Sequence, residues 1–208
     1  MKSIKAARDN AHSIDWSNYT PPKPSFIGTK VFNDFPLDKL VERIDWTPFF
    51  QTWELAGKFP KILDDEVVGT HAKQLYSDAK AMLESIVAEK WITANGIIGF
   101  YPANSQGDDI LVYQDETRSQ VVERLCHLRE QKDKANSNPN YCLSDYIAPE
   151  QSGLTDYVGG FAVGAGFGIE ARIAQYDADH DDYNSIMLKA LADRLAEAFA
   201  EKLHELVR

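Results

Sequence analysis

The order in which helical and strand-like patterns follow one another constrains the fold of this 208-residue chain more than any other feature. Apolar residues at helical spacing predict an amphipathic helix over about 68–90: Leu75, Ala79, Met82, Leu83, Ile86 and Val87. Strand-like segments follow at 91–101 and 109–113, and the turn-forming residues 104–108 between them predict a hairpin.

Further patterns follow towards the C-terminus. Residues 155–164 are strand-like, and apolar periodicity predicts helices over about 168–178 and 181–206. A hairpin followed by helices, without steady βαβ alternation, predicts an α+β domain.

Weaker patterns predict the remaining elements. Residues 36–41 favour a short helix, and Thr47 followed by Pro48 suits a helix start, with Thr47 as the capping residue. We expect a helix over 116–131, because three apolar residues share one helical face: Val121, Leu125 and Leu128.

Two segments indicate linkers or loops. The prolines at 21–24 stiffen the chain, so residues 1–30 are expected to form an N-terminal linker or strap. Residues 31–208 would then form one domain, with a polar loop at 132–140.

The charge balance and cysteine content exclude several classes of function. Acidic residues outnumber basic ones by 32 to 22, and a formal charge of −10 repels nucleic acid. No stretch approaches the ~20 apolar residues that a membrane span needs. Two cysteines are too few for a disulfide framework or a Cys-based zinc site, which favours a cytoplasmic protein with reduced thiols.

Two motifs resemble known sites but lack defining residues. Gly164 and Gly166 follow a strand-like segment as in a dinucleotide-binding turn, yet Ile169 stands where the third glycine belongs, which favours a tight strand-to-helix turn. The acidic segment 177–182 lacks the glycine and distal glutamate of a calcium loop, so Asp179 or Asp181 is expected to cap the next helix. No catalytic residue and no metal ligand is predicted.

The last helical segment carries a core face and an acidic face. The core face comprises Met187, Leu191, Leu195, Ala198 or Phe199, and Leu203. Asp193, Glu197 and Glu201 stand four residues apart on another face, where like charges repel. A solvent-facing surface balanced by Lys189, Arg194 or Lys202 explains this pattern, and a cationic ligand held against Glu197 is the alternative.

Asp45 stands in an aromatic segment, IDWTPFFQTW. Because Thr47 suits the N-cap, Asp45 is not needed for capping. A carboxylate beside aromatic faces suits a cationic, flat-ringed ligand. An aromatic core with Asp45 bonded to backbone explains the segment equally well.

Longer segments carry a family resemblance: IDWTPFFQTWELAGKFPKIL, GFYPANSQGDDILVY, NYCLSDYIAP, DYVGGFAV and HDDYNSIMLKALADRLAEAFAEKLHELVR. In this order they resemble the C-terminal activation domain of cobalamin-dependent methionine synthase, over nearly all of residues 3–208. The resemblance implies a single C-shaped α+β domain with a twisted antiparallel sheet flanked by helices.

The resemblance also implies a function as part of a homocysteine methyltransferase. In that family the domain presents S-adenosylmethionine as methyl donor for the reductive methylation of cob(II)alamin, which a neighbouring cobalamin domain carries. A flavodoxin or diflavin reductase supplies the electron. Asp45 and Glu197 match residues that bind S-adenosylmethionine in the family. Asp193, on the same acidic face as Glu197, is the expected contact with the cobalamin domain.

The sequence departs from the family pattern at Arg208, before an R-P-x-P-G-Y-P motif that grips the ligand's carboxylate and adenosine. We therefore expect a truncated domain with an incomplete active site and weak affinity for S-adenosylmethionine. Two alternatives stay open: a docking module for a cobalamin domain or reductase that binds no ligand itself, and a nucleotide-cofactor oxidoreductase that uses the glycine turn at Gly164.

Overall fold

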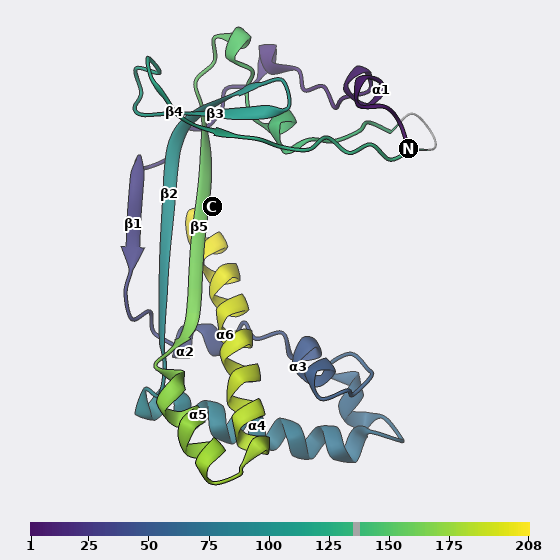
Figure 1. The fold of residues 1–208 in the computed structure, drawn as a ribbon, viewed down its shortest axis with the longest axis vertical. Coiled ribbons are helices and arrows are strands. Elements are labelled where there is room, and N and C mark those ends of the chain that lie inside the picture. The colour runs from purple at the N-terminus through teal and green to yellow at the C-terminus, as the bar shows by residue number, and fades with distance from the viewer. Residues whose placement is uncertain (135–137) are drawn as a thin grey trace. The chain divides into compact units, whose positions relative to one another are not determined.

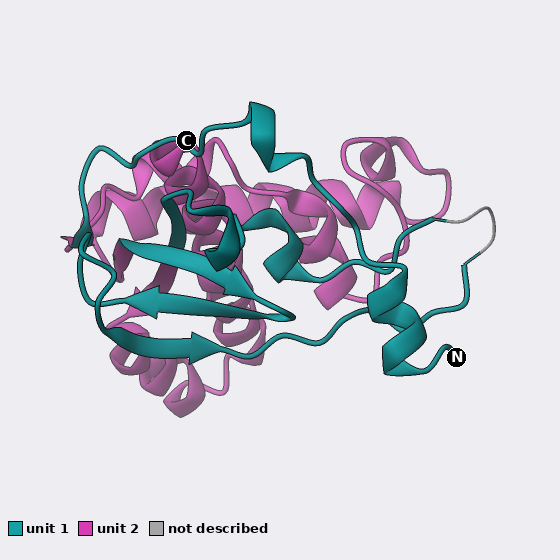
Figure 2. Ribbon diagram, turned by 90° about the horizontal axis from the view of Figure 1, so that it is seen from above, with its two compact units in different colours: residues 1–29, 99–160 teal, residues 30–98, 161–208 magenta. Residues whose placement is uncertain are grey.

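The structure is a computed structural model that describes residues 1–134 and 138–208 (Figure 1). The chain divides into two compact units, residues 1–29 with 99–160 and residues 30–98 with 161–208 (Figure 2). Residues 135–137 of the predicted polar loop lie outside the described residues.

Among the described residues, five strands form the sheet, in the order β1 (Gly28–Phe32), β2 (Thr93–Gln106), β3 (Asp109–Tyr113) and β4 (Val121–Leu125), with β5 (Asp156–Phe167) also paired to β2. The predicted strand at 155–164 is confirmed as β5. Short 3-10 helices occur at Trp16–Asn18, Lys61–Asp64, Leu143–Tyr146 and Glu150–Ser152.

The predicted hairpin is confirmed, but β2 continues further than the sequence indicated. β2 and β3 are antiparallel, with Gln106 opposite Asp109, so the turn between them contains only Gly107 and Asp108. Two of the residues expected in the turn, Asn104 and Ser105, are instead buried, and the Asn104 amide donates to the carbonyls of Ala148 and Leu154 at 2.9 and 3.0 Å. Since these bonds satisfy its polar group, a turn-forming residue type is accommodated inside a strand.

The helix expected over 116–131 is wrong, because this segment contains strand β4. β4 pairs antiparallel with β3, with Ile110 opposite Leu125. Leu128, which the helical pattern placed on one apolar face with Val121 and Leu125, is 96% exposed. The adjacent β-branched residues Val121 and Val122 favour a strand, and the backbone of β3 offers hydrogen-bonding partners that a helix could not use.

A buried charge cluster organises the first unit. The Arg129 guanidinium donates to Asp108 at 2.8 Å and to Asp145 at 2.8 and 2.6 Å, and it also bonds the Asn140 carbonyl. Arg8, which lies in α1 (Ile4–Asp9), donates to the other oxygen of Asp108 at 2.7 Å. Hydrogen bonds that Arg129 donates to Asp145, followed by the one it donates to Asp108, raise the pKa of Arg129 against the effect of burial. The cluster thereby ties α1 to the β2–β3 turn.

The second unit contains the predicted long helices. They are confirmed as α4 (Gly69–Glu89), α5 (Ile169–Ala178) and α6 (Asp182–Val207), and the short helix predicted at 36–41 is α2 (Asp38–Val41). None of the helices that the structure describes is long and apolar enough to cross a membrane.

Helix α6 lies at the centre of this unit and packs against α2, α4 and α5. Its predicted core face is confirmed, since all the residues named for it are buried: Met187, Leu191, Leu195, Ala198, Phe199 and Leu203. Phe199 approaches β2 so closely that a Cβ at Gly96 would lie 2.9 Å from its ring. Glycine at position 96 therefore permits the contact between strand and helix.

The segments around α5 have the structural roles that the sequence favoured. β5 passes into α5 through Gly166 and Gly168, with φ of 105° and 92°, values that glycine adopts without strain. Asp181 is the N-cap of α6, and its Oδ1 accepts a hydrogen bond from the Asn184 N–H at 3.0 Å. Among the described residues, no group of three or more His, Cys, Asp or Glu side chains is placed to hold a metal ion.

Candidate functional site

Asp45 is the N-cap of α3 (Trp46–Thr52), which corrects the expectation that Thr47 caps this helix. Its Oδ1 accepts a hydrogen bond from the Thr47 N–H at 2.9 Å. The Thr47 hydroxyl instead accepts from the Phe59 N–H at 3.3 Å. The Asp45 carboxylate is exposed, and its Oδ2 bonds no group in the part of the chain that the structure describes.

The aromatic residues beside Asp45 form a packed core. The ring of Trp46 meets Tyr76 edge-on, with centroids 4.8 Å apart, and contacts Phe49 at 5.3 Å. Phe49 and Phe50 are completely buried, and Trp46 is 8% exposed. The segment therefore matches the interpretation of an aromatic core with Asp45 bonded to the backbone. The Asp45 carboxylate nevertheless faces solvent.

The acidic face of α6 is exposed, as predicted, and is partly neutralised by Arg194. This side chain donates to Asp193 through Nη2 at 2.5 Å and to Glu197 through Nη1. The Arg194 side chain is only 12% exposed, against 72% for Asp193 and 52% for Glu197. One guanidinium thus offsets the repulsion between two carboxylates that stand a helical turn apart. The i, i+3 spacing of Arg194 and Glu197 was visible in the sequence, but the sharing of one guanidinium by two acids was not.

A polar and aromatic contact that sequence reasoning missed joins the helices that carry Asp45 and Glu197. Trp53, at the end of α3, packs against Tyr183 of α6 with ring centroids 5.0 Å apart. The Tyr183 hydroxyl donates to Asp78 of α4 at 2.8 Å. Burial, together with this bond to Asp78, raises the pKa of Tyr183 to about 12. The contact links α3, α4 and α6, and no sequence motif predicts it.

The structure brings Asp193 and Glu197 together but places Asp45 on a separate element. Helix α3 packs against α6 within the second unit, and among the described residues no hydrogen bond or ion pair joins Asp45 to Glu197. Each of these two exposed carboxylates has one oxygen with no partner in the described part of the chain. Such oxygens can accept charge-assisted hydrogen bonds from a cationic ligand.

Comparisons with known proteins place this chain in a family. Residues 36–208 match the family described as "Vitamin B12 dependent methionine synthase, activation domain". The chain belongs to this family, and the resemblance carried by its sequence segments is confirmed.

A solved structure described as "Crystal Structure of the MetH Reactivation Domain bound to AdoHcy" is similar to this chain at 51% sequence identity. The two structures agree with a TM-score of 0.94 over 100% of this chain, which confirms the α+β fold class. The chain spans 63% of the length of that relative.

Proposed function

We propose that this chain is the reactivation module of a cobalamin-dependent methionine synthase and that it binds S-adenosylmethionine. The observation that carries the proposal is its likeness, at 51% identity over its whole length, to a reactivation domain bound to AdoHcy. AdoHcy is what remains of S-adenosylmethionine once the methyl group has been transferred. A fold that holds one of these molecules is therefore suited to the other.

In this proposal Asp45 and Glu197 hold the cationic part of the ligand. S-adenosylmethionine carries an ammonium group and a sulfonium centre, and exposed carboxylates with free acceptor oxygens complement both. When bound, the ligand supplies an electrophilic methyl group. The part of this chain is to bind the ligand and to orient it.

The proposed partners follow from the same function. The methyl acceptor is cobalamin carried by a separate domain, and Asp193, 72% exposed on α6, is the proposed contact with that domain. A flavodoxin or diflavin reductase would supply the electron, and the cytoplasm is the proposed location.

A reactivation assay tests the proposal. The cobalamin domain of a methionine synthase in its cob(II)alamin form is mixed with a reductase and S-adenosylmethionine, and conversion to methylcobalamin is followed by absorbance. Adding a longer chain that carries the R-P-x-P-G-Y-P segment should accelerate the conversion, and its double variant Asp45→Asn, Glu197→Gln should not. A parallel sample uses the 208-residue chain, whose expected weak affinity for S-adenosylmethionine predicts a smaller acceleration. If neither chain accelerates the conversion although both are folded, the proposed function is wrong.

A further inference from the structure

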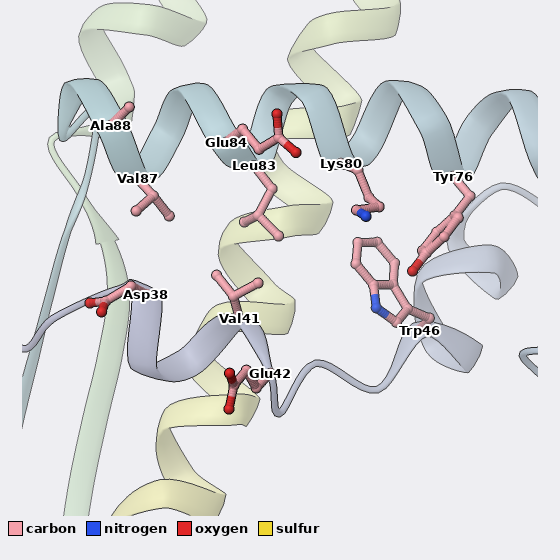
Figure 3. Close-up of a pocket in the computed structure, with 10 residues that line it drawn as sticks. All are labelled: Asp38, Val41, Glu42, Trp46, Tyr76, Lys80, Leu83, Glu84, Val87 and Ala88. Atoms are coloured by element: carbon pink, nitrogen blue, oxygen red, sulfur yellow. The ribbon is translucent and has the colours of Figure 1, made fainter.

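A groove runs between α2 and α4 on the second unit, apart from the residues assigned to the ligand (Figure 3). Its volume is about 550 Å³, within the range of sites that bind ligands or side chains. We name it the α2–α4 groove, and its lining residues are Asp38, Val41, Glu42, Trp46, Tyr76, Lys80, Leu83, Glu84, Val87 and Ala88. Neither Asp45 nor Glu197 lines it.

The floor of the α2–α4 groove is apolar. Figure 3 shows Val41 of α2 facing Leu83 of α4, with Val87 further along the same helix. At the other end, Trp46 lies beside Tyr76, and the edge-on contact of these rings at 4.8 Å fixes their orientation. Apolar side chains of a bound partner can pack against such a floor at successive positions along it.

The rim of the groove is acidic at one end. Asp38 and Glu42 on α2 and Glu84 on α4 are all exposed, and no ion pair holds any of them within the described residues. The single basic residue of the lining, Lys80, stands at the aromatic end, with its Nζ 6.0 Å from the centre of the Tyr76 ring. The groove therefore carries more negative charge towards Asp38 than towards Trp46, on a chain with a formal charge of −10.

The dimensions of the groove match a short helix. Its wall on α4 extends from Tyr76 to Ala88, which at ~1.5 Å per residue is roughly 18 Å, or about three helical turns. An amphipathic helix laid in such a groove inserts apolar residues at i, i+4 and i+7.

We propose that the α2–α4 groove docks a basic amphipathic helix of a partner protein. Apolar side chains of that helix occupy the floor between Val41 and Leu83 and beside Trp46. Its Lys or Arg residues pair with Asp38, Glu42 and Glu84 at one end, and a neutral or acidic residue lies next to Lys80. Charge complementarity selects this occupant over an acidic or uncharged helix.

A binding measurement with designed peptides tests the proposal. The probe is a fluorescently labelled helical peptide of about three turns, with leucines at i, i+4 and i+7 and lysines at the positions facing Asp38, Glu42 and Glu84. A peptide with the same leucines and glutamates in place of the lysines is the matched control. We expect the basic peptide to bind the 208-residue chain at least tenfold more tightly than the acidic one, with an affinity that falls as salt is added.

Variants of one helix locate the binding. Ala88 and Ala81 are both exposed on α4, but only Ala88 lines the groove. Ala88→Arg should weaken binding of the basic peptide at least tenfold by filling the groove and adding positive charge, whereas Ala81→Arg should leave it unchanged. Circular dichroism and a melting curve establish that both variants are folded.

Charge reversal inside and outside the groove completes the test. Glu42→Lys should weaken binding of the basic peptide and strengthen binding of the acidic one, and Glu66→Lys, an exposed charge reversal outside the groove, should affect the binding of neither peptide. Equal binding of the two peptides, or equal loss of binding in Ala88→Arg and Ala81→Arg, overturns the proposal. Because Asp45 and Glu197 lie outside the groove, its failure would not bear on binding of S-adenosylmethionine.

Discussion

Arg194 and Glu197 form an ion pair across one turn of α6, and the same guanidinium also holds Asp193. The carboxylate proposed to bind a cationic ligand is therefore already oriented by a cation from its own helix. Arg194 is mostly buried, so its charge belongs to the fixed structure of this face, while Asp193 and Glu197 remain accessible.

Replacing Arg194 should destabilise the chain modestly. Arg194→Met leaves Asp193 and Glu197 as an unbalanced pair of like charges at helical spacing, and we expect a loss of about 1 kcal/mol in the free energy of unfolding. Urea unfolding measures this loss, and added salt should reduce it. Lys189→Met, an exposed change on the same helix, is the control. Equal losses in the two variants would show that the shared ion pair contributes nothing.

The capping role of Asp45 can be separated from its charge. Asparagine caps helices about as well as aspartate, so Asp45→Asn should leave the free energy of unfolding nearly unchanged. Asp45→Ala removes the bond to the Thr47 N–H and should cost about 1 kcal/mol. Thermal or urea unfolding of both variants checks the difference. A loss in Asp45→Asn as large as that in Asp45→Ala would indicate that the charge, and not the cap, stabilises α3.

Lowering the pH should destabilise the first unit, because the Asp108 carboxylate becomes protonated. Burial raises the pKa of Asp108, but hydrogen bonds from Arg8 and Arg129 outweigh it and hold the pKa below its usual 3.8. A carboxylate with a lowered pKa stabilises the folded state fully above its unfolded-state pKa, and that stabilisation is lost as the pH falls through the lower folded-state pKa. Unfolding free energies measured from about pH 6 to about pH 2 should fall more steeply for the wild type than for Asp108→Asn. Parallel curves would contradict this.

Contact with a cobalamin domain should depend on Asp193. Asp193→Lys reverses an exposed charge on α6 and should slow reactivation of a cobalamin-bound partner. The remaining rate should also depend less on salt, because an attractive pair has been removed. Glu66→Lys, an exposed charge reversal elsewhere in the second unit, is the control. If wild type and Asp193→Lys react at equal rates at every salt concentration, Asp193 does not contact the partner.

The success of sequence-based prediction depended on how much apolar periodicity each segment contains. α4 and α6 were located to within a few residues, because apolar residues repeat over many turns and lie on one buried face. The prediction for 116–131 failed because an i, i+4, i+7 pattern arises by chance across strand β4 and the irregular segment that follows it. The pairing of β4 with β3 depends on a partner strand that local periodicity does not reveal.

The candidate site was predictable only as separate residues. Charge spacing identified the acidic face of α6, and the aromatic segment drew attention to Asp45. The choice of Asp45 over Thr47 as the N-cap turned on which side chain reaches a backbone N–H, since both residue types cap well. The link from Trp53 through Tyr183 to Asp78 joins three helices that are distant in sequence, so no local pattern could have shown it.

Isothermal titration of S-adenosylmethionine and AdoHcy into the wild type, Asp45→Asn and Glu197→Gln tests the central claim most directly. The titrations of the variants are made in a longer chain with the R-P-x-P-G-Y-P segment, with Glu66→Gln as the control, and the 208-residue chain itself should bind more weakly than the longer one. A charge-assisted hydrogen bond contributes roughly 1.5–3 kcal/mol, so each of the two site variants should bind at least about tenfold more weakly than wild type. The Glu66→Gln control should bind as wild type does. Unchanged affinity in both site variants, with the fold intact, would contradict the assignment of these carboxylates to the ligand.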